Sequence, residues 1–263
     1  MKTANWTDTG RVRLVNEDRA FVEACVSGFG FAVVADGMGG HLAGEVASQM
    51  TTQYITEQVR ERLQSGMGTE EVAELLRTLI REANSKVYHH SRTSEQYMGM
   101  GTTVVAAIAD HRHVIVGHIG DSRAYVISGR NIVQLTEDHS LVNELLKSGQ
   151  INEEEALNHP RRNVLVRALG TDPEVDIDII CHSWQENDVL LLCTDGLSRL
   201  VSTEAIVETI RSDAAWNDKA GQLVEQALEA GGDDNITVVL LINEPDEPSS
   251  KQEEGTGGRG EAG

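Results

Sequence analysis

The stretch VVADGMGGHLAGE, residues 33–45, joins an apolar run typical of a buried strand to a segment that begins a helix. A single acid, Asp36, ends the apolar run, and four glycines and His41 follow it within nine residues. Glycine leaves the backbone uncovered, so other groups can approach it closely. The stretch therefore places one carboxylate at a strand end that is nearly free of other side chains.

Apolar runs of strand length recur along the chain, and short turns join them in pairs. Three such pairs are found, at residues 19–26 and 29–35, 101–109 and 113–119, and 123–128 and 131–135. Short connections require antiparallel pairing, because parallel neighbours need a long crossover. Further strands are predicted at residues 174–180, 188–193 and 235–242.

Helical periodicity fills the longer segments, at residues 44–64, 69–92 and about 203–230. Paired helices interleaved with antiparallel strands predict an α+β fold, in which sheets lie between helical layers. A chain of 263 residues with 40% hydrophobic content can bury one large core. We therefore expect a single domain over residues 1–243.

Composition restricts the location and the partners of the protein. The chain has neither an apolar run of about 18 residues nor an apolar secretory signal, which predicts a cytoplasmic protein. A net charge of -20 argues against binding to nucleic acid or to an anionic membrane, because both would be repelled. Residues 244–263 are acidic and lack large apolar side chains, so we expect a disordered tail.

Acidic residues cluster at the ends of the predicted strands. Four lie directly at strand ends and two lie just before the first apolar strand: Asp36, Asp121, Asp195, Asp234, Glu17 and Asp18. Antiparallel neighbours bring the end of one strand beside the start of the next, so these carboxylates can converge. Taken singly, Asp-Gly is an ordinary turn pair, and residues 233–235 can form an Asx turn. Converged carboxylates need a compensating cation, and hard oxygen ligands favour Mg²⁺ or Mn²⁺ over Zn²⁺.

Eight motifs occur in a fixed order along residues 5–242: RLVNED, VVADGMGGHLAGEVAS, GTT, GHIGDSRAY, LTEDHS, RALG, LLCTDGL and GGDDNITVV. Each motif alone is weak, but the ordered set is specific. The chain resembles the metal-dependent type 2C serine/threonine protein phosphatases, and in particular their compact bacterial members. The resemblance implies a four-layer αββα sandwich of two antiparallel sheets flanked by helix pairs, with a small flap at about residues 139–170.

The resemblance also implies two metal ions in a cleft at one edge of the sandwich. Asp36 would bridge both ions and the carbonyl of Gly37 would ligate one of them. Asp195 and Asp234 would ligate the other ion. In this arrangement the glycines after Asp36 let the backbone approach a metal and its waters.

Four further residues take roles from the same resemblance. Glu17 and Asp18 would act mainly through metal-bound water, and Arg13 would hold the phosphate. Asp121 would belong to a more loosely bound third metal. Family members often carry an acid four residues after the Asp-Gly aspartate, whereas this chain has Arg199 there, which weakens the case for that metal. Alternatively, Arg199 is a solvated residue on a turn.

The implied activity is hydrolysis of phosphoserine and phosphothreonine in proteins by a hydroxide that bridges two Mn²⁺ or Mg²⁺ ions. Arg13 can hold two phosphate oxygens in a planar fork. His41 is the candidate general acid for the leaving alkoxide, because histidine titrates near neutrality. Alternatively, His41 is a residue at the start of a helix or hydrogen-bonds to a group that ligates a metal. The expected substrates include proteins phosphorylated by a serine/threonine kinase, and we expect a monomer.

Three other functions compete with this hypothesis. Cys193 and Arg199 have the Cys-x5-Arg spacing of cysteine-dependent phosphatases, although Asp195 would then lie inside an anion-binding loop. The chain could also be a phosphoprotein-binding pseudophosphatase, or it could hydrolyse small phosphate esters.

The three cysteines, Cys25, Cys181 and Cys193, lack metal-ligand spacing and are expected to be reduced, buried thiols.

We predict that His41→Ala lowers kcat and flattens one limb of the pH–rate profile, because the leaving group then loses its proton donor. The measurement is kcat from pH 5 to 9 for the wild type and the variant. An unchanged profile would remove His41 from the mechanism.

Overall fold

The structure is a computed structural model that describes residues 1–39 and 42–244, with the side chain of Leu157 excepted. His41 and residues 245–263 of the expected tail lie outside the described residues. One sheet contains, in order, β1 (Lys2–Asp8), β11 (Ile236–Ile242), β10 (Val189–Cys193), β7 (Arg123–Ser128) and β8 (Asn131–Gln134). The other contains β2 (Asp18–Val26), β3 (Phe29–Met38), β5 (Val104–Ala109), β6 (His113–Ile119) and β9 (Asp178–Ser183), and β4 (Gly101–Thr102) pairs with β3.

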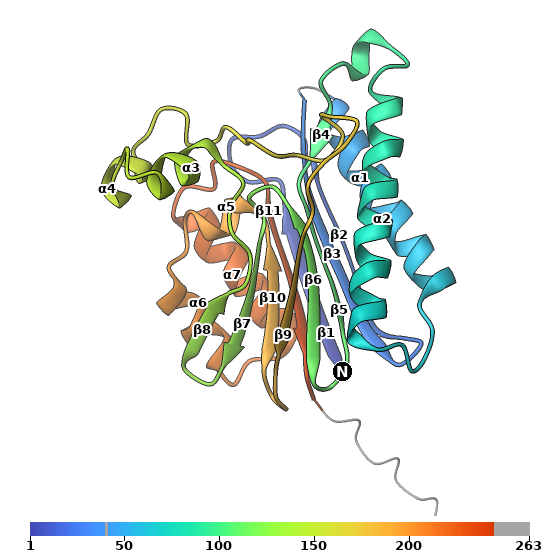
Figure 1. Ribbon diagram of the computed structural model, residues 1–263. Helices are drawn as coiled ribbons and strands as arrows, with labels where there is room; N and C mark the ends of the chain where they lie inside the picture. The colour runs from blue at the N-terminus through green and yellow to red at the C-terminus, as the bar shows by residue number, and fades with distance from the viewer. Residues whose placement is uncertain (40–41, 245–263) are drawn as a thin grey trace, which may run out of the picture.

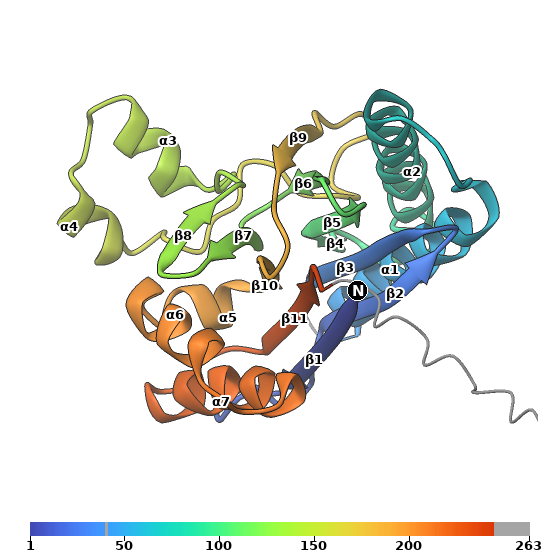
Figure 2. The same cartoon turned by 90° about the horizontal axis from the view of Figure 1, so that it is seen from below.

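The two sheets pack face to face between two layers of helices (Figures 1 and 2). Helices α1 (Ala43–Arg62) and α2 (Thr69–His90) cover the β2–β9 sheet, and η1 (Glu95–Tyr97) follows them. Helices α5 (Asp195–Ser198), α6 (Thr203–Arg211) and α7 (Trp216–Glu229) cover the other sheet. All strand pairs are antiparallel, so the predicted α+β sandwich is confirmed.

Successive side chains of the central strands pack into different cores, because they point to opposite faces of the sheet. In β3, Val33 packs under α1 and α2, whereas Val34 points into the core between the sheets. In β10, Leu191 packs under the α5–α7 layer, whereas Leu190 and Leu192 point between the sheets. Strands buried on both faces are held in place from two sides, so their ends are rigid positions for a site.

The prediction differs from the structure at three elements: β1, the helical block at residues 203–230 and the strand at residues 174–180. Strand β1 was not predicted, because its residues are mostly polar and only Ala4 is fully buried. The helical block at residues 203–230 is two helices, interrupted after Arg211. The strand expected at residues 174–180 is β9, which begins later, at Asp178.

The predicted flap leaves the body after β8 and returns before β9 (Figure 1). It contains α3 (Leu141–Lys147) and α4 (Glu153–Leu157). The two arms of the flap pair with each other through an isolated bridge between Ser140 and Leu165. The backbone N–H of Val166 also donates to the carbonyl of His139 at 2.9 Å. The flap is therefore a closed loop with its own short ladder.

The cysteine prediction is partly wrong. Cys193 is fully buried in β10, but Cys25 and Cys181 are exposed. Both exposed cysteines lie on strands at the edges of the second sheet, β2 and β9, where alternate side chains face solvent.

Among the described residues, no helix is both long and apolar enough to cross a lipid bilayer.

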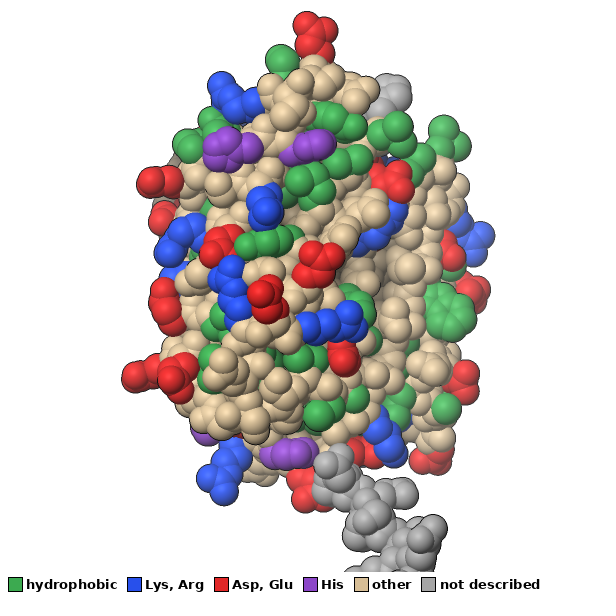
Figure 3. Space-filling view, turned by 90° about the vertical axis from the view of Figure 1, so that its right-hand side faces the viewer, with side chains coloured by type: hydrophobic (Ala, Val, Ile, Leu, Met, Phe, Trp, Pro, Cys, Tyr) green, Lys and Arg blue, Asp and Glu red, His purple; other side chains and the backbone are tan. Residues whose placement is uncertain are grey.

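The face that carries α1 and α2 shows acidic and basic side chains interspersed with apolar ones (Figure 3). Ion pairs on this part of the molecule join Arg60 to Glu23 at 2.8 Å and Arg62 to Glu82 at 3.0 Å. Some acidic side chains on this part of the molecule are therefore neutralised by neighbouring arginines.

Two glycines from the opening stretch are required by close packing. A Cβ atom on Gly37 would lie 2.0 Å from the carbonyl oxygen of Gly44, and one on Gly44 would lie 2.4 Å from Oε1 of Glu17. Real Cβ atoms do not approach backbone so closely, so the start of α1 can rest on the end of β3 only because both residues are glycine. This contact holds Glu17, Asp36 and the first turn of α1 together.

We predict that Gly37→Ala lowers the free energy of unfolding by about 2 kcal/mol or more, because α1 must move away from β3. Gly221→Ala is the matched control, since its Cβ would have only an ordinary contact with Trp6 at 3.6 Å. Alanine inside α7 is expected to leave the stability unchanged or raise it by about 0.5–1 kcal/mol. Urea denaturation measures both, and equal effects would contradict the packing argument.

Candidate metal centre

A cleft of about 220 Å³ opens where the two sheets end, beside the glycine-rich stretch. Its lining includes seven of the nine predicted site residues: Arg13, Glu17, Asp36, Gly37, Asp121, Asp195 and Asp234. Asp18 lies behind the wall of the cleft and is 2% exposed. The predicted convergence of acids from distant parts of the sequence at one sheet end is thus observed.

The pairing of β2 with β3 places two of these acids side by side, because Asp18 lies opposite Asp36 in the ladder. Oδ2 of Asp18 accepts hydrogen bonds from the hydroxyls of Thr194 at 2.9 Å and Thr237 at 2.7 Å. These threonines belong to the other sheet layer, one just after β10 and one within β11. Asp18 therefore links the two sheets directly beneath the cleft.

Burial raises the pKa of several carboxyl groups around the cleft. The pKa of Asp18 is raised to about 7, mainly by burial, with the threonine hydroxyls opposing the shift. The pKa of Asp36 is raised well above its usual range, first by burial and then by the charge of Asp18. Burial also raises the pKa of Asp195, and that of Asp121 to about 7. The cleft thus concentrates negative charge where little water can solvate it.

Three buried carboxylate oxygens have no hydrogen-bond partner within the described part of the chain: Oε1 of Glu17, Oδ1 of Asp18 and Oδ1 of Asp195. Buried polar atoms are nearly always satisfied, and a buried anionic oxygen without a partner is costly. These atoms are oxygen donors with free lone pairs. Their chemistry suits a hard divalent cation.

Asn235 fixes the N-terminal segment that carries Arg13 and Glu17. Its side-chain oxygen accepts the backbone N–H of Glu17 at 2.8 Å, and its Nδ2 donates to the carbonyls of Thr9 at 2.8 Å and Val15 at 3.0 Å. From the sequence, Asn235 is expected only to be part of a turn. In the structure it is 4% exposed, whereas Asp233 is exposed and Asp234 is half-buried, and no local sequence pattern marks this difference.

Two arginines that are far apart in the sequence form ion pairs with the acids of the cleft. Nη2 of Arg13 lies 2.7 Å from Oδ2 of Asp234. Nη2 of Arg199 lies 2.9 Å from Oδ2 of Asp121 and 2.9 Å from Oδ2 of Asp195. Arg199 is an exposed residue, as the alternative expects, but its guanidinium pairs with two carboxylates and not with solvent alone. The role of Asp121 as a ligand of a third metal stays a prediction.

The thiol of Cys193 is fully buried inside β10, and burial raises its pKa to about 12. At neutral pH it is therefore protonated, and a protonated thiol is a poor nucleophile. The Cys-x5-Arg spacing arises because β10 ends at Cys193 and α5 follows it, with Arg199 as the C-cap of α5. Arg199 there contacts a carboxylate and not a phosphate-binding loop.

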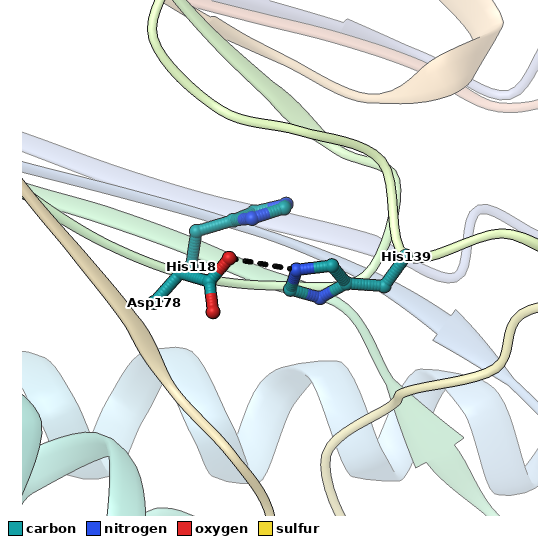
Figure 4. A group of neighbouring side chains, drawn as sticks. All are labelled: His118, His139 and Asp178. Carbon is teal, nitrogen blue, oxygen red and sulfur yellow. Dashed lines mark hydrogen bonds and ion pairs between the residues drawn. The ribbon is translucent and has the colours of Figure 1, made fainter. Parts of the chain in front are cut away.

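A second polar cluster consists of His118, His139 and Asp178, lies beside Gly120 and was not predicted (Figure 4). Within residues 1–39 and 42–244, His118, His139 and Asp178 form the one group of three candidate ligands whose atoms all lie within 4.8 Å. Nδ1 of His139 accepts the N–H of Gly120 at 3.1 Å, and Nε2 lies 3.1 Å from Oδ2 of Asp178. Nε2 must then carry the proton, and a protonated nitrogen has no lone pair for a metal.

The cluster instead fastens the flap to the body. Oδ1 of Asp178 accepts a hydrogen bond from Arg167 at 2.9 Å, so Asp178 holds His139 at one end of the flap and Arg167 at the other. His118 packs against the ring of His139 at a centroid distance of 4.6 Å and is fully buried. Burial lowers the pKa of His118 to about 3, so it is neutral at physiological pH.

The sequence is similar to known proteins along most of its length. The model of the family described as "Protein phosphatase 2C" matches residues 9–231. The serine/threonine phosphatase stp of Listeria monocytogenes is 41% identical over 235 residues, which cover 89% of this chain and 93% of that protein.

The fold is also similar to that of solved structures. The crystal structure of a bacterial serine phosphatase is 36% identical, with a TM-score of 0.87, and covers 94% of this chain and 100% of that one. A structure of the catalytic domain of the serine/threonine protein phosphatase PstP in complex with two manganese ions is 33% identical, with a TM-score of 0.77, and covers 91% and 96%. From the matched family model, the shared fold and the cleft, we conclude that the chain belongs to the protein phosphatase 2C family.

Proposed function

We propose that this serine/threonine phosphatase hydrolyses phosphoserine and phosphothreonine in proteins with two divalent cations, Mn²⁺ or Mg²⁺, held in the acid cleft. The observation that carries the proposal is the set of buried carboxylate oxygens in and directly behind one cleft that have no partner among the described residues, with an accessible arginine beside them. Residues 1–243 would form one catalytic domain, with the flap at residues 139–170. The predictions of a cytoplasmic location and a monomer rest on composition and family resemblance.

The residues of the cleft fit a pair of divalent cations. Asp36 would bridge both ions, the carbonyl of Gly37 would ligate one, and Asp195 and Asp234 would ligate the other. Glu17 and Asp18 would act through water, which suits Asp18, since it lies behind the wall of the cleft. The related PstP structure with two manganese ions supports two ions of this kind. Bound cations would supply Lewis acidity toward the phosphate and toward water.

Arg13 would bind the phosphate. Its side chain is 48% exposed at the mouth of the cleft, and it pairs with Asp234 in this structure. A guanidinium can release a partly exposed carboxylate and hold two phosphate oxygens in its fork, which fixes the orientation of the ester. The exposed position suits a substrate that enters from solvent on a protein surface. His41, outside the described residues, keeps its proposed role as general acid.

The structure favours this proposal over the thiolate mechanism, because Cys193 is fully buried with a raised pKa. Against a pseudophosphatase, Asp36, Asp195 and Asp234 are all present in the cleft. Substrates would include proteins phosphorylated by a serine/threonine kinase.

We predict that Asp195→Asn lowers the rate of phosphate release from a phosphothreonine peptide by at least about 100-fold, which is about 2.7 kcal/mol in the barrier. EDTA should abolish the wild-type activity and Mn²⁺ should restore it. Cys193→Ala is the matched control and should retain activity, since the thiol is buried.

The assay uses the peptide and a sugar phosphate at equal concentration. Activity that survives EDTA and is lost with Cys193→Ala would support the thiolate mechanism instead. A preference for the sugar phosphate would assign small esters as substrates, and no activity under any condition would indicate a binding protein.

We also predict a stability effect of Asp18 in EDTA. Its folded pKa of about 7 lies above the ordinary value near 4, so the folded state holds more protons between these pH values. The contribution of Asp18 to stability therefore falls as pH rises from about 4 to 7. Asp18→Asn keeps an oxygen that can accept from Thr194 and Thr237, and should become more stable relative to the wild type at pH 8 than at pH 5.

Chemical denaturation at both pH values measures this difference. Asp218→Asn, an exposed position on α7, is the control and should show no pH-dependent difference from the wild type. Added Mn²⁺ should stabilise the wild type more at pH 8 than at pH 5, because the carboxylates are then ionised. An equal difference at both pH values would contradict the raised pKa of Asp18.

A further inference from the structure

Arg199 occupies a position between two acids and the flap. It caps α5, four residues after Asp195, so its side chain can fold back along the helix. The same nitrogen, Nη2, lies 2.9 Å from Asp121 and 2.9 Å from Asp195, and Nη1 donates to Oδ1 of Asn163 in the flap. One guanidinium therefore joins three segments of the chain.

The charges explain why a cation is needed at this point. The side chains of Asp121 and Asp195 are only 7% and 11% exposed, and Arg199 is 28% exposed. Two carboxylates in so dry a place repel each other unless positive charge lies between them. The planar guanidinium is always charged and offers several donors in fixed directions. It can therefore contact the two carboxylates and the side-chain oxygen of Asn163 at the same time.

Asn163 shows that the guanidinium is not held by the acids alone. It is neutral, belongs to the flap and lines the same cleft. Its side-chain oxygen accepts from Nη1, whereas the two acids contact Nη2, so the flap and the body hold different nitrogens of the guanidinium. The position of Arg199 is thus determined from two independent elements.

We infer that Arg199 is a built-in cation that occupies the place between Asp121 and Asp195, so that this phosphatase binds two divalent ions and no third at Asp121. The inference rests on the proposed function for the two-ion site itself. Arg199 is a positioning residue: it holds Asp195 for the cleft and tethers the flap through Asn163. A third-ion role for Asp121 would require the ion pair with Arg199 to break.

Counting bound Mn²⁺ by equilibrium dialysis and metal analysis tests the inference. The wild type should bind two Mn²⁺ per chain, and Asp121→Asn should leave that number unchanged. Arg199→Gln should bind one additional Mn²⁺, and the double variant with Asp121→Asn should lose it. Arg130→Gln, exposed on the turn between β7 and β8, is the matched control and should bind two.

A third Mn²⁺ on the wild type that is lost with Asp121→Asn would overturn the inference. So would an unchanged count in a folded Arg199→Gln variant, with folding checked by circular dichroism. The wild-type and Asp121→Asn counts decide the question even if Arg199→Gln does not fold. Failure of the proposed function would look different, because the wild type would then bind no Mn²⁺ or release no phosphate.

The tether to the flap has its own readout. Arg161 and Arg162 are exposed beside Asn163, so trypsin can report on the mobility of this segment. Asn163→Ala and Arg199→Gln should both speed cleavage at these arginines several-fold, whereas Arg130→Gln should not. Equal cleavage rates in all variants would remove the tether from the inference.

Discussion

Mutual repulsion among carboxylates at the shared end of two sheets is the constraint on which this structure depends. Asp18, Asp121 and Asp195 are each less than 10% exposed, and Asp36 stands in the same group. Two means compensate three of these acids: threonine hydroxyls donate to Asp18, and one guanidinium lies between Asp121 and Asp195. The remaining unpartnered oxygens mark where compensation must come from outside the described residues.

The sandwich is well suited to hold such a site, because its central strands are fixed from both faces. Alternate residues of β3 and β10 enter separate cores, so neither strand can shift without disturbing two packed layers. A slip of one residue between β2 and β3 would also exchange those faces and separate Asp18 from Asp36. The precision of the cleft is therefore a property of the cores beneath it.

Most of the strands and helices and the acids that line the cleft could be predicted from the sequence, because apolar runs, short turns and strand-end acids are local patterns. The places of Arg13 and Gly37 followed only from the family resemblance. Strand β1 could not be predicted, since a polar edge strand has almost no hydrophobic signal. The roles of Asn235, and of the cluster of His118, His139 and Asp178, depend on contacts between residues far apart in sequence. Nor could spacing show that Arg199 faces two acids rather than solvent.

The two ends of the chain meet at the cleft: Arg13 pairs with Asp234, which is 221 residues away. Strand β1 also lies beside β11, the last strand. During synthesis β1 therefore has no neighbour in its sheet, and Arg13 has no Asp234 to pair with, until the segment from Asp234 through β11 has been made. A nascent chain shorter than this lacks part of the lining of the cleft, so the cleft forms late and all at once rather than strand by strand.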